Sequence, residues 1–373
     1  MNNFSLQEYL EALARIVNID SGSKNTEGTG KIAAFFEERY TKLGLAVRKF
    51  YPSQAGGPCL EIRNKPESDT IDVLFLGHMD TVFPDGTAAA RPFKNENGML
   101  YGPGVYDMKS GLLSIYYTIK ELLKNGTDIS FCVAHNSDEE ISSPYSREWL
   151  CALGRKSRYG LIFESGRKNG DFVNKRKGLA KFRLEFSGIA AHAGVAPEKG
   201  ASAVLEMSRW INELALMNNY EAGTSLNAGA VSGGTAANVV AANAWCEIDT
   251  RFTAVEELDK IKQKIDELSQ KRFDGRVTVT SSMGGYRPPM NPGERTFELM
   301  RLFEECGKAA GISVNWISTG GGSDGNLIAH EGCAVIDSLG PSGDKSHSDE
   351  EYALVDSIEP RLNLMAQVVK KLA

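Results

Sequence analysis

Residues 71–80 read IDVLFLGHMD, an almost unbroken apolar run that ends in a histidine and, two residues later, an aspartate. A continuous run of this kind is typical of a strand that is buried on both faces of a sheet. Three similar runs follow along the chain: ISFCVAH (129–135), GLIFES (160–165) and CAVIDSLG (333–340). We therefore predict a sheet whose buried strands each lead into polar residues.

Helical patterns lie between these runs. The segment GLLSIYYTIKELLKNG (111–126) stops at Asn-Gly, and TFELMRLFEECGKAAG (296–311) stops at Gly. Glycine and asparagine commonly end helices, so both segments are expected to be helical. Strands that alternate with helices predict an α/β domain built on a mostly parallel sheet.

The middle of the chain has a different pattern. LAKFRLEFSG (179–188) alternates strictly between apolar and polar residues, as an antiparallel strand with one wet face does. After it we expect a helix at about 201–218, strands near 225–231 and 238–252, a helix at about 255–271 and a strand at 276–282. This β-α-β-β-α-β order is that of a ferredoxin-like domain. The predicted organisation is an α/β domain at 1–176 and 288–373, interrupted by a smaller α+β module at 177–287.

The composition excludes several classes of protein. A chain of 373 residues is too long for one ordinary core, which agrees with two domains. The net charge is −6 and the basic cluster at 175–177 is small, so we expect no nucleic-acid partner. No segment reaches the roughly 18–20 apolar residues that span a membrane, so no membrane partner is expected either.

The N-terminus and the cysteines bear on the cellular compartment. Residues 1–20 carry apolar residues at helical spacing between charges, which predicts an amphipathic helix and not a signal peptide. The six cysteines are scattered and form no CxxC pair. We therefore expect reduced thiols and a cytoplasmic protein.

Potential metal ligands follow every predicted buried strand and one glycine-rich turn. They are His78, Asp107, Glu139 or Glu140, Glu164 and His347. In an open α/β sheet, ligands bind beyond the carboxyl ends of the strands, so these side chains are expected to meet. Nitrogen and oxygen ligands without a thiolate fit catalytic zinc, with cobalt or manganese as alternatives. Five ligands are too many for one open site, and they suit two metals that share a carboxylate, roughly 3.5–4 Å apart.

The acids that are left over have expected roles of their own. Asp80 stands two residues after His78 and can accept the proton of the second imidazole nitrogen. The stretch HNSDEE (135–140) supplies more carboxylates than the metals need. An acid beside a metal-activated water is a general base, so one glutamate would hold metal and its neighbour would take the proton. The alternative is a solvated turn before a helix, since acids favour helix N-termini.

At this point the chain resembles a known family, the co-catalytic zinc aminopeptidases and carboxypeptidases. The resemblance is strongest to bacterial glutamate carboxypeptidases, in a family that also holds aminoacylases and acetylornithine and succinyl-diaminopimelate deacylases. It covers nearly the whole chain in order. The motifs that carry it are HMDTVFPDG (78–86), YGPGVYDMKSG (101–111), SDEE (137–140), SGIAAHAGVAPEKG (187–200), GGTAANVV (233–240), DTR (249–251), TGGGSDG (319–325) and HSDEEY (347–352).

The resemblance implies a division of roles among these residues. One zinc ion would be held by His78, Asp107 and Glu164, and the other by Asp107, Glu140 and His347, so that Asp107 bridges them. Glu139 would be the general base and Asp80 would orient His78. The resemblance also implies a cis peptide between Asp107 and Met108, where some relatives have a second aspartate instead of Met108.

The resemblance implies that the inserted module is a lid and dimerisation domain and that the protein is a homodimer. His192 would reach the active site of the partner subunit and stabilise the oxyanion there. Asn238 and Arg251 would grip the terminal carboxylate of the substrate, and Gly322 of the catalytic domain would help to line the pocket. Taken singly, His192 would more often be a loop histidine and Arg251 an ion-pair partner.

Three other features have structural interpretations. His135 ends a buried strand, His330 lies near a helix end, and neither falls on a family motif, so both are expected to be structural. The glycines at 320–322 could suggest a phosphate cradle. A dinucleotide fingerprint requires GxGxxG spacing directly after an early strand, which this late triplet lacks.

These observations predict a two-metal hydrolase that cleaves an amide bond next to a free carboxylate. The expected substrate is a small peptide or an N-acyl amino acid. Release of a C-terminal glutamate-like residue is the first choice, and deacylation of N-acyl amino acids is the alternative. A non-catalytic binding protein on the same fold would lack a ligand or Glu139, and the full set is present. A nucleotide-dependent enzyme is disfavoured because phosphate loops are missing.

Overall fold

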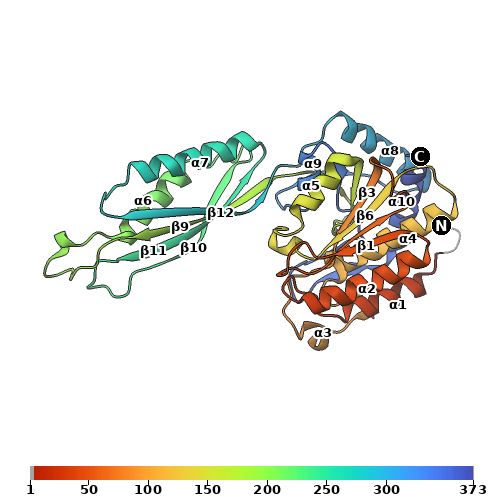
Figure 1. Cartoon of the computed structure of the whole chain (residues 1–373), viewed down its shortest axis with the longest axis horizontal. Helices are drawn as coiled ribbons and strands as arrows, with labels where there is room; N and C mark the ends of the chain where they lie inside the picture. Colours follow the sequence, from red (N-terminus) through yellow and green to blue (C-terminus); the bar gives the residue numbers. More distant parts are fainter. Residues whose placement is uncertain (1–3, 373) are drawn as a thin grey trace. The chain divides into compact units, whose positions relative to one another are not determined.

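The computed structural model describes residues 4–372 and divides into two compact units (Figure 1). The first unit contains the chain up to Lys175, Met290–Thr319 and the chain from Ser323 onward. The second contains Arg176–Pro289 and Gly320–Gly322. The sequence assigned Gly322 to the catalytic domain. In the structure it belongs to the second unit, because its backbone lies against Leu179 and Arg287.

The core of the first unit is a six-stranded sheet with strand order β1-β2-β6-β3-β7-β14. Its strands are β1 (Ala46–Phe50), β2 (Cys59–Arg63), β3 (Ile71–His78), β6 (Phe131–Asn136), β7 (Ser157–Ile162) and β14 (Ala334–Ile336). Four neighbours, β6, β3, β7 and β14, run parallel, and β2 is antiparallel to both of its neighbours. The predicted mostly parallel sheet is therefore confirmed.

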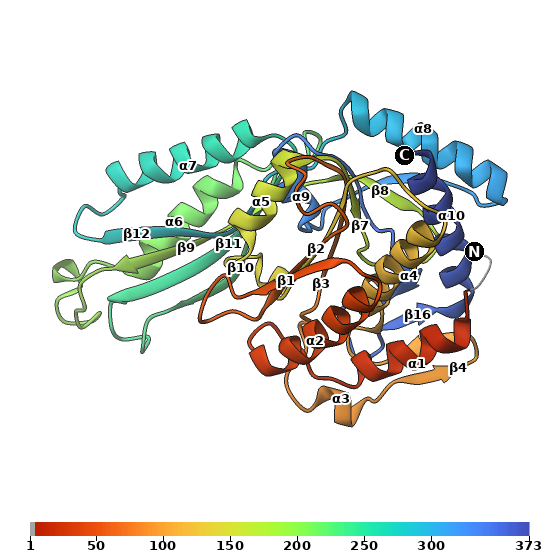
Figure 2. The ribbon, with the colours of Figure 1, turned by 45° about the vertical axis from the view of Figure 1, so that its right-hand side comes forward.

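Helices cover both faces of this sheet, which explains why its central strands are continuously apolar (Figure 2). The larger core packs one face against α1 (Leu6–Val17), α2 (Thr26–Lys42), α4 (Ser110–Lys124), α8 (Glu294–Ala310) and α10 (Ile358–Lys371). A smaller core packs the other face against α5 (Arg147–Lys156) and α9 (Gly325–His330). The predicted N-terminal amphipathic helix is α1, whose Leu13 and Val17 are fully buried.

Short elements complete the first unit. A small sheet has the order β15-β16-β5-β4, with β15 (Gly343–Asp344), β16 (Tyr352–Leu354), β5 (Met99–Tyr101) and β4 (Lys94–Glu96). The strands β8 (Phe172–Arg176) and β13 (Trp316–Thr319) pair with each other. The remaining helical turns are α3 (Thr87–Ala90), η1 (Val105–Lys109), η2 (Glu139–Ile141) and η4 (Val355–Ser357).

The second unit is an antiparallel sheet with two helices on one face. Its elements follow the predicted β-α-β-β-α-β order: β9 (Gly178–Ser187), α6 (Ala203–Ala215), β10 (Ser225–Gly233), β11 (Asn243–Phe252), α7 (Val255–Gln270) and β12 (Thr278–Arg287), with a turn η3 (Pro197–Lys199). The strand order is β10-β11-β9-β12. Alternate β9 residues, such as Phe182 and Leu184, are buried against α6 and α7, while Lys181 and Glu185 are exposed on the other face.

Two predicted strands differ from the observed ones. The run at 333–340 forms only the three-residue strand β14, because the chain turns at Asp337 to pair with Val173 and then curves away through Ser338, which has a φ of 62°. The strand expected from 238 begins at Asn243, and the residues before it form a loop. All six cysteines are free, and no described helix is long and apolar enough to cross a membrane.

Candidate metal centre

The predicted metal ligands of the first unit collect at the carboxyl edge of its parallel strands. His78 is the last residue of β3, Glu139 and Glu140 lie in η2 shortly after β6, and Glu164 follows β7 by two residues. Asp107 lies in η1 and His347 in the loop between β15 and β16. Adjacent parallel strands end at one edge of the sheet, so the sequence pattern becomes a spatial cluster.

Asp107 stands between the two histidines. Its Oδ1 atom is 3.4 Å from Nε2 of His78, and its Oδ2 atom is 3.2 Å from Nε2 of His347. Nε2 of His78 is also 3.6 Å from Oε1 of Glu164, and Nε2 of His347 is 3.3 Å from Oε2 of Glu140. The five side chains thus form two groups that share one carboxylate, the arrangement a bridged pair of metal ions needs.

The donor atoms fit divalent cations. Oδ1 of Asp107 and Oε1 of Glu140 are buried, and neither makes a hydrogen bond within the described part of the chain. A buried carboxylate oxygen without a partner is costly, and a cation removes that cost. Glu139 offers an oxygen within 4.8 Å of the ligand atoms of His78 and Glu164, so it lies beside the same cluster.

The electrostatics of the cluster also favour bound positive charge. Hydrogen bonds to Asp107 and Glu140 raise the pKa of His347 to about 11. Burial alone would lower the pKa of His78, but the surrounding carboxylates, Glu164 foremost, raise it well above its usual value. Burial raises the pKa of Glu140 and of Glu164. Closely spaced buried acids favour the binding of a cation, which can be a proton or a metal ion.

Asp80 connects His78 to the acidic turn. Nδ1 of His78 is 3.0 Å from the backbone oxygen of Asp80 and 3.4 Å from its Oδ1 atom. An Nδ1–H bond to these oxygens leaves Nε2 facing the other side chains of the cluster, where it could bind a metal. The Asp80 carboxylate also accepts hydrogen bonds from the backbone N–H groups of Glu139 (3.2 Å) and Glu140 (3.1 Å) and from the Ser23 hydroxyl (2.6 Å). Sequence reasoning did not find this second set of contacts.

The first acid of the DEE turn, Asp138, supports the turn itself. Its carboxylate accepts hydrogen bonds from the backbone N–H groups of Tyr145 (2.7 Å) and Ser146 (3.0 Å) and from the Ser146 hydroxyl (2.5 Å). Asp138 is buried, which raises the pKa of its carboxyl group. The three consecutive acids therefore have separate surroundings, and only the second and third face the metal centre.

Glu351 is a residue of the site region that the sequence reasoning missed. Its buried carboxylate accepts hydrogen bonds from the backbone N–H groups of Gly104 (3.0 Å), Tyr106 (2.9 Å) and Asp107 (2.9 Å). Burial raises the pKa of Glu351 to about 7. This clamp fixes the glycine-rich turn that carries Asp107, in which Gly104 has a φ of 72°. Its only signal in the sequence was a place in the HSDEEY motif, four residues after His347.

The peptide bond between Asp107 and Met108 is cis, as predicted. Lys109, close by, is buried, and its ammonium group donates a 2.8 Å hydrogen bond to the backbone oxygen of Ile19. Burial lowers the pKa of Lys109 to about 7. The turn is therefore tied to the N-terminal segment as well as to Glu351.

The predicted substrate residues lie in the second unit. His192 is exposed, and its Nδ1 atom accepts a 3.1 Å hydrogen bond from the backbone N–H of Gly194. The next residue, Ala193, donates its N–H to the backbone oxygen of Asn238 at 2.9 Å, so the loops that carry His192 and Asn238 are adjacent. Arg251 is half-buried and donates two hydrogen bonds, of 2.8 and 3.1 Å, to the carboxylate of Asp249.

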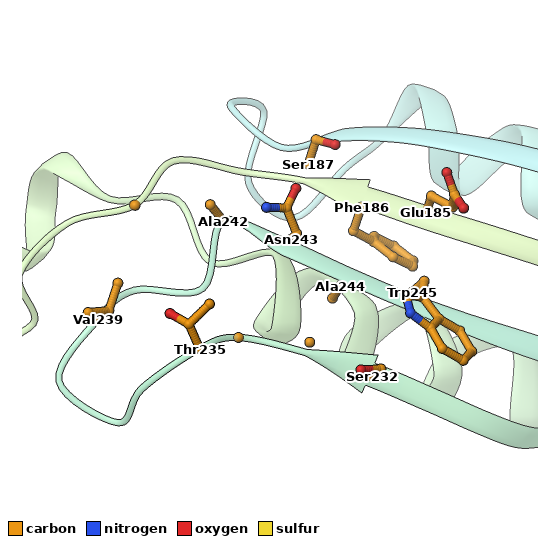
Figure 3. Close-up of a pocket in the computed structure, with 13 residues that line it drawn as sticks. Glu185, Phe186, Ser187, Ser232, Thr235, Val239, Ala242, Asn243, Ala244 and Trp245 are labelled. Carbon is orange, nitrogen blue, oxygen red and sulfur yellow. The ribbon is translucent and has the colours of Figure 1, made fainter.

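A pocket of about 480 Å³ lies beside these loops, at the end of β9 and the start of β11 (Figure 3). It is lined by both polar and aromatic side chains, among them Thr235, Asn243, Trp245 and Phe186. Gly233, Gly234, Thr235 and Val239 of its lining belong to the GGTAANVV motif. The motif therefore forms the wall of a cavity in addition to carrying Asn238.

The other two histidines are separate from the metal centre. His135 is fully buried, with Nδ1 3.3 Å from the backbone oxygen of Gly77 and Nε2 3.4 Å from the hydroxyl of Tyr40. Burial lowers the pKa of His135 to about 4, so it is neutral in the core. His330 is exposed at the end of α9.

Two relatives are similar in sequence to this chain over most of its length. Carboxypeptidase G2 from Pseudomonas sp. (strain RS-16) is 29% identical over 97% of this chain and 89% of its own. A succinyl-diaminopimelate desuccinylase from Paracidovorax citrulli (strain AAC00-1) is 27% identical over 80% of each chain.

Solved structures share the fold. Aminopeptidase PepT from Bacillus cereus ATCC 10987 matches with a TM-score of 0.79 and 23% identity over 99% of both chains. The M20 family metallo-carboxypeptidase Sso-CP2 from Sulfolobus solfataricus matches with a TM-score of 0.79 and 18% identity, over 98% of this chain and 99% of its own. The model of peptidase family M20/M25/M40 matches residues 74–371, a span that holds all five predicted ligands, and the chain belongs to this family of metal-dependent hydrolases.

Proposed function

We propose that this protein is a two-metal carboxypeptidase that cleaves an amide bond next to a free carboxylate and releases a glutamate-type residue. The observation that carries the proposal is the position of Asp107, whose two oxygens face His78 and His347 separately. Such a carboxylate suits two metal ions held close together, and paired metals are typical of hydrolases that activate water.

The metal-binding residues divide into two sets. We assign His78, Asp107 and Glu164 to one ion, and Asp107, Glu140 and His347 to the other. Zinc is our choice of metal, because imidazole and carboxylate ligands without thiolate suit a catalytic zinc site. When bound, the ions would supply Lewis-acid activation of a water molecule and of the amide carbonyl.

Glu139 is assigned the proton transfers. Its carboxylate lies beside the cluster, and its backbone N–H is held by Asp80. It would take a proton from the attacking water and then give that proton to the leaving amine. Glu140, held in the same way by Asp80, faces His347 and is assigned the role of a ligand.

Arg251 and Asn238 are assigned to the free carboxylate of the substrate. Gly322 is assigned to the pocket lining, and it lies against Leu179, the residue that pairs with Arg251 across β9 and β11. The Asp249 carboxylate accepts hydrogen bonds from Nε and Nη2, along one edge of the Arg251 guanidinium, and fixes its plane. A guanidinium has five N–H donors, so donors remain for a substrate carboxylate. This ion pair also allows the simpler interpretation that Arg251 is structural, which substrate variation can test.

His192 is assigned to the oxyanion of the reaction. Because its Nδ1 atom accepts a hydrogen bond from Gly194, the neutral ring carries its proton on Nε2. An exposed Nε2–H is the donor that an oxyanion needs. We propose that the second unit joins two chains into a homodimer and that His192 serves the active site of the partner subunit.

A deacylase of N-acyl amino acids is the second candidate. The substrates of such a deacylase have the same amide beside a carboxylate. A succinyl-diaminopimelate desuccinylase is among the relatives that cover most of the chain. We also propose a cytoplasmic location, since the six cysteines are free and five of them are buried.

One experiment separates the two candidates. Purified protein, reconstituted with zinc, is assayed against glutamyl peptides, folate-type substrates and N-acetyl and N-succinyl amino acids. The proposal expects the highest kcat/KM for amides of C-terminal glutamate. Preference for N-succinyl or N-acetyl amino acids without regard to the amine half would favour the deacylase. No hydrolysis of any amide by protein that holds two metals per chain would refute both.

A further inference from the structure

His347 is the proposed ligand with the most exposed side chain. Its side chain is 53% exposed, whereas those of the other four proposed ligands are at most 14% exposed. It lies in a loop of residues 345–350 between β15 and β16, which we call the His347 loop. Lys345 and His347 have φ angles of 61° and 63°, in the left-handed region that favours glycine. A backbone of this kind persists only where the surrounding contacts hold it.

Contacts within the His347 loop fix its shape but not its place on the unit. The Ser348 hydroxyl donates a 2.8 Å hydrogen bond to the backbone oxygen of Lys345 and accepts a 3.3 Å hydrogen bond from the backbone N–H of Glu350. The ammonium group of Lys345 is 2.5 Å from Oε2 of Glu350. All of these partners would move together if the loop moved. Contacts from outside the loop must therefore decide where the imidazole of His347 stands.

Arg91 supplies such contacts from a distant part of the chain. Its Nη1 atom donates hydrogen bonds to the backbone oxygens of Asp349 (2.9 Å) and Ser348 (3.4 Å), and its Nε atom is 3.4 Å from Oδ1 of Asp349. Asp107 and Glu140 face the imidazole itself. Apart from these two acids, no other side chain of residues 4–372 reaches the loop from outside with a hydrogen bond or an ion pair.

The Arg91 side chain is itself well supported. It is only 22% exposed, and its guanidinium lies over the ring of Phe83, 4.7 Å from the ring centroid. A guanidinium over an aromatic ring is held by the charge distribution of the ring. The main chain before Arg91 is tied down as well, because the carboxylate of Asp20 accepts hydrogen bonds from the backbone N–H groups of Gly86 (2.8 Å) and Ala88 (2.7 Å). A fixed donor therefore holds an exposed loop.

We propose that Arg91 is a positioning residue for His347 and thereby decides the affinity of the metal ion assigned to Asp107, Glu140 and His347. The proposal rests on the proposed function, which makes His347 a ligand. Groups that orient a ligand before the metal arrives commonly strengthen metal binding, because the ligand then loses less freedom when the ion binds. Arg91 contacts the His347 loop and none of the other proposed ligands, so the second ion should not depend on it.

The test titrates metal-free protein with zinc in competition with a chelating dye. Arg91→Ala should weaken one of the two ions about 10–100-fold and leave the other within about threefold of its native affinity. Arg91→Lys should lie between the two, because lysine keeps a charged donor but not the planar edge. Arg48→Ala is the matched control and should bind both ions as the native chain does. Arg48 lies over the ring of Phe50 and bonds to Glu61 at 2.6 Å, on β1.

A second background separates positioning of His347 from general support of the fold. In His347→Ala protein, only the ion that does not use His347 is expected to bind tightly. Adding Arg91→Ala there should change the affinity of that ion by less than about twofold, because the residue through which Arg91 acts is absent. A further loss of about tenfold would overturn the proposal, and so would native affinity for both ions, or equal weakening of both, in Arg91→Ala alone. Should Arg91→Ala not fold, Arg91→Lys carries the same comparison.

The outcomes keep this proposal apart from the proposed function. Protein that binds two ions, loses affinity for one of them in Arg91→Ala and hydrolyses no amide would refute the proposed carboxypeptidase and leave the role of Arg91 standing. Protein that cleaves amides of C-terminal glutamate and binds both ions equally well in the native chain and in Arg91→Ala would do the reverse.

Discussion

The carboxylate of Glu351 accepts a 2.9 Å hydrogen bond from the backbone N–H of Asp107, the residue that stands between His78 and His347. Two further N–H groups of the same turn, those of Gly104 and Tyr106, point at the same carboxylate. Glu351 therefore positions Asp107, the proposed bridging ligand, and is not itself one of the five clustered side chains. Outer residues of this kind commonly decide how tightly a metal is held.

We expect Glu351→Gln to weaken metal binding about 10–100-fold, because an amide nitrogen would face at least one N–H donor where a carboxylate oxygen accepted it. Competition with a chelating dye measures the affinity of each metal. Glu350→Gln is the matched control, since the adjacent Glu350 is exposed and pairs with Lys345. Native affinity in Glu351→Gln would show that the clamp does not support Asp107.

Glu139 and Glu140 should respond differently to the same substitution. Glu139→Gln should keep both metals and lower kcat on the order of 10²–10⁴-fold or more, because the proton acceptor is lost. Glu140→Gln should lower metal occupancy, because a ligand that faces His347 is lost. Elemental analysis and kcat, measured on the same preparations, distinguish the two effects. The reverse pattern would mean that the two roles are exchanged.

Arg251 should matter only for substrates that carry a free carboxylate. Amidation of the substrate terminus is expected to lower kcat/KM about 10²-fold in the native enzyme, through loss of a charge-assisted contact. Arg251→Lys should be nearly as damaging as Arg251→Ala, because lysine cannot reproduce the planar fork that Asp249 holds. Metal content should be unchanged in both variants. Equal cleavage of amidated and free substrates would leave Arg251 as a structural partner of Asp249.

His135 should make the fold less stable as the pH falls. Burial lowers its pKa in the folded protein to about 4, whereas an unfolded chain has the ordinary value of about 6.5. Between pH 6.5 and 4 the histidine is protonated in the unfolded state but stays neutral in the folded state. The contribution of His135 to the free energy of unfolding is therefore complete above pH 6.5 and is lost as the pH approaches 4. The loss amounts to about 3 kcal/mol at most.

Urea unfolding of metal-loaded protein between pH 7.5 and 5 measures this effect. His135→Gln should flatten the pH dependence of the unfolding free energy relative to the native chain. His330→Gln changes an exposed histidine at the end of α9 and should leave the slope as it is. An unchanged slope in His135→Gln would show that other groups cause the acid sensitivity.

His192 should act across subunits if the proposed homodimer forms. His192→Ala and Glu139→Gln chains, each nearly inactive alone, should recover activity when mixed. In each heterodimer, one of the two active sites combines the native Glu139 of one chain with the native His192 of the other. The measurement is kcat after verified exchange of differently tagged subunits. Absence of recovery would place the action of His192, if it has one, within its own subunit.

The sheet, and the places of the clustered side chains at its strand ends, were predictable because local signals agreed with the global fold. The run at 71–78 forms β3 with the predicted bounds, since a continuous apolar run has few other stable placements than a doubly covered strand. His78 could then be placed at a strand end, and Glu164 shortly after another. The small strands β4, β5, β15 and β16 were not foreseen, because two- and three-residue strands have no readable periodicity.

The contacts that hold the ligands were less accessible to sequence reasoning. Glu351 and Asp107 are 244 positions apart, and no local pattern links a carboxylate to a distant backbone N–H. The hydrogen bonds from Glu139 and Glu140 to Asp80 likewise use backbone groups, which every sequence contains. Side-chain chemistry can be inferred from residue types, but the partners of main-chain donors depend on the completed fold.

The proposed metal ligands come from distant parts of the chain, with His78 early, His347 near the end and the whole second unit between them in sequence. Ions that hold all five side chains at once would act as reversible cross-links between these segments. Only the folded chain presents the complete set, so every increase in free metal concentration above the dissociation constant would add to the free energy of unfolding. Scarcity of metal would then reduce the lifetime of the protein as well as its turnover, because the unfilled chain opens more readily and exposes its backbone to proteases.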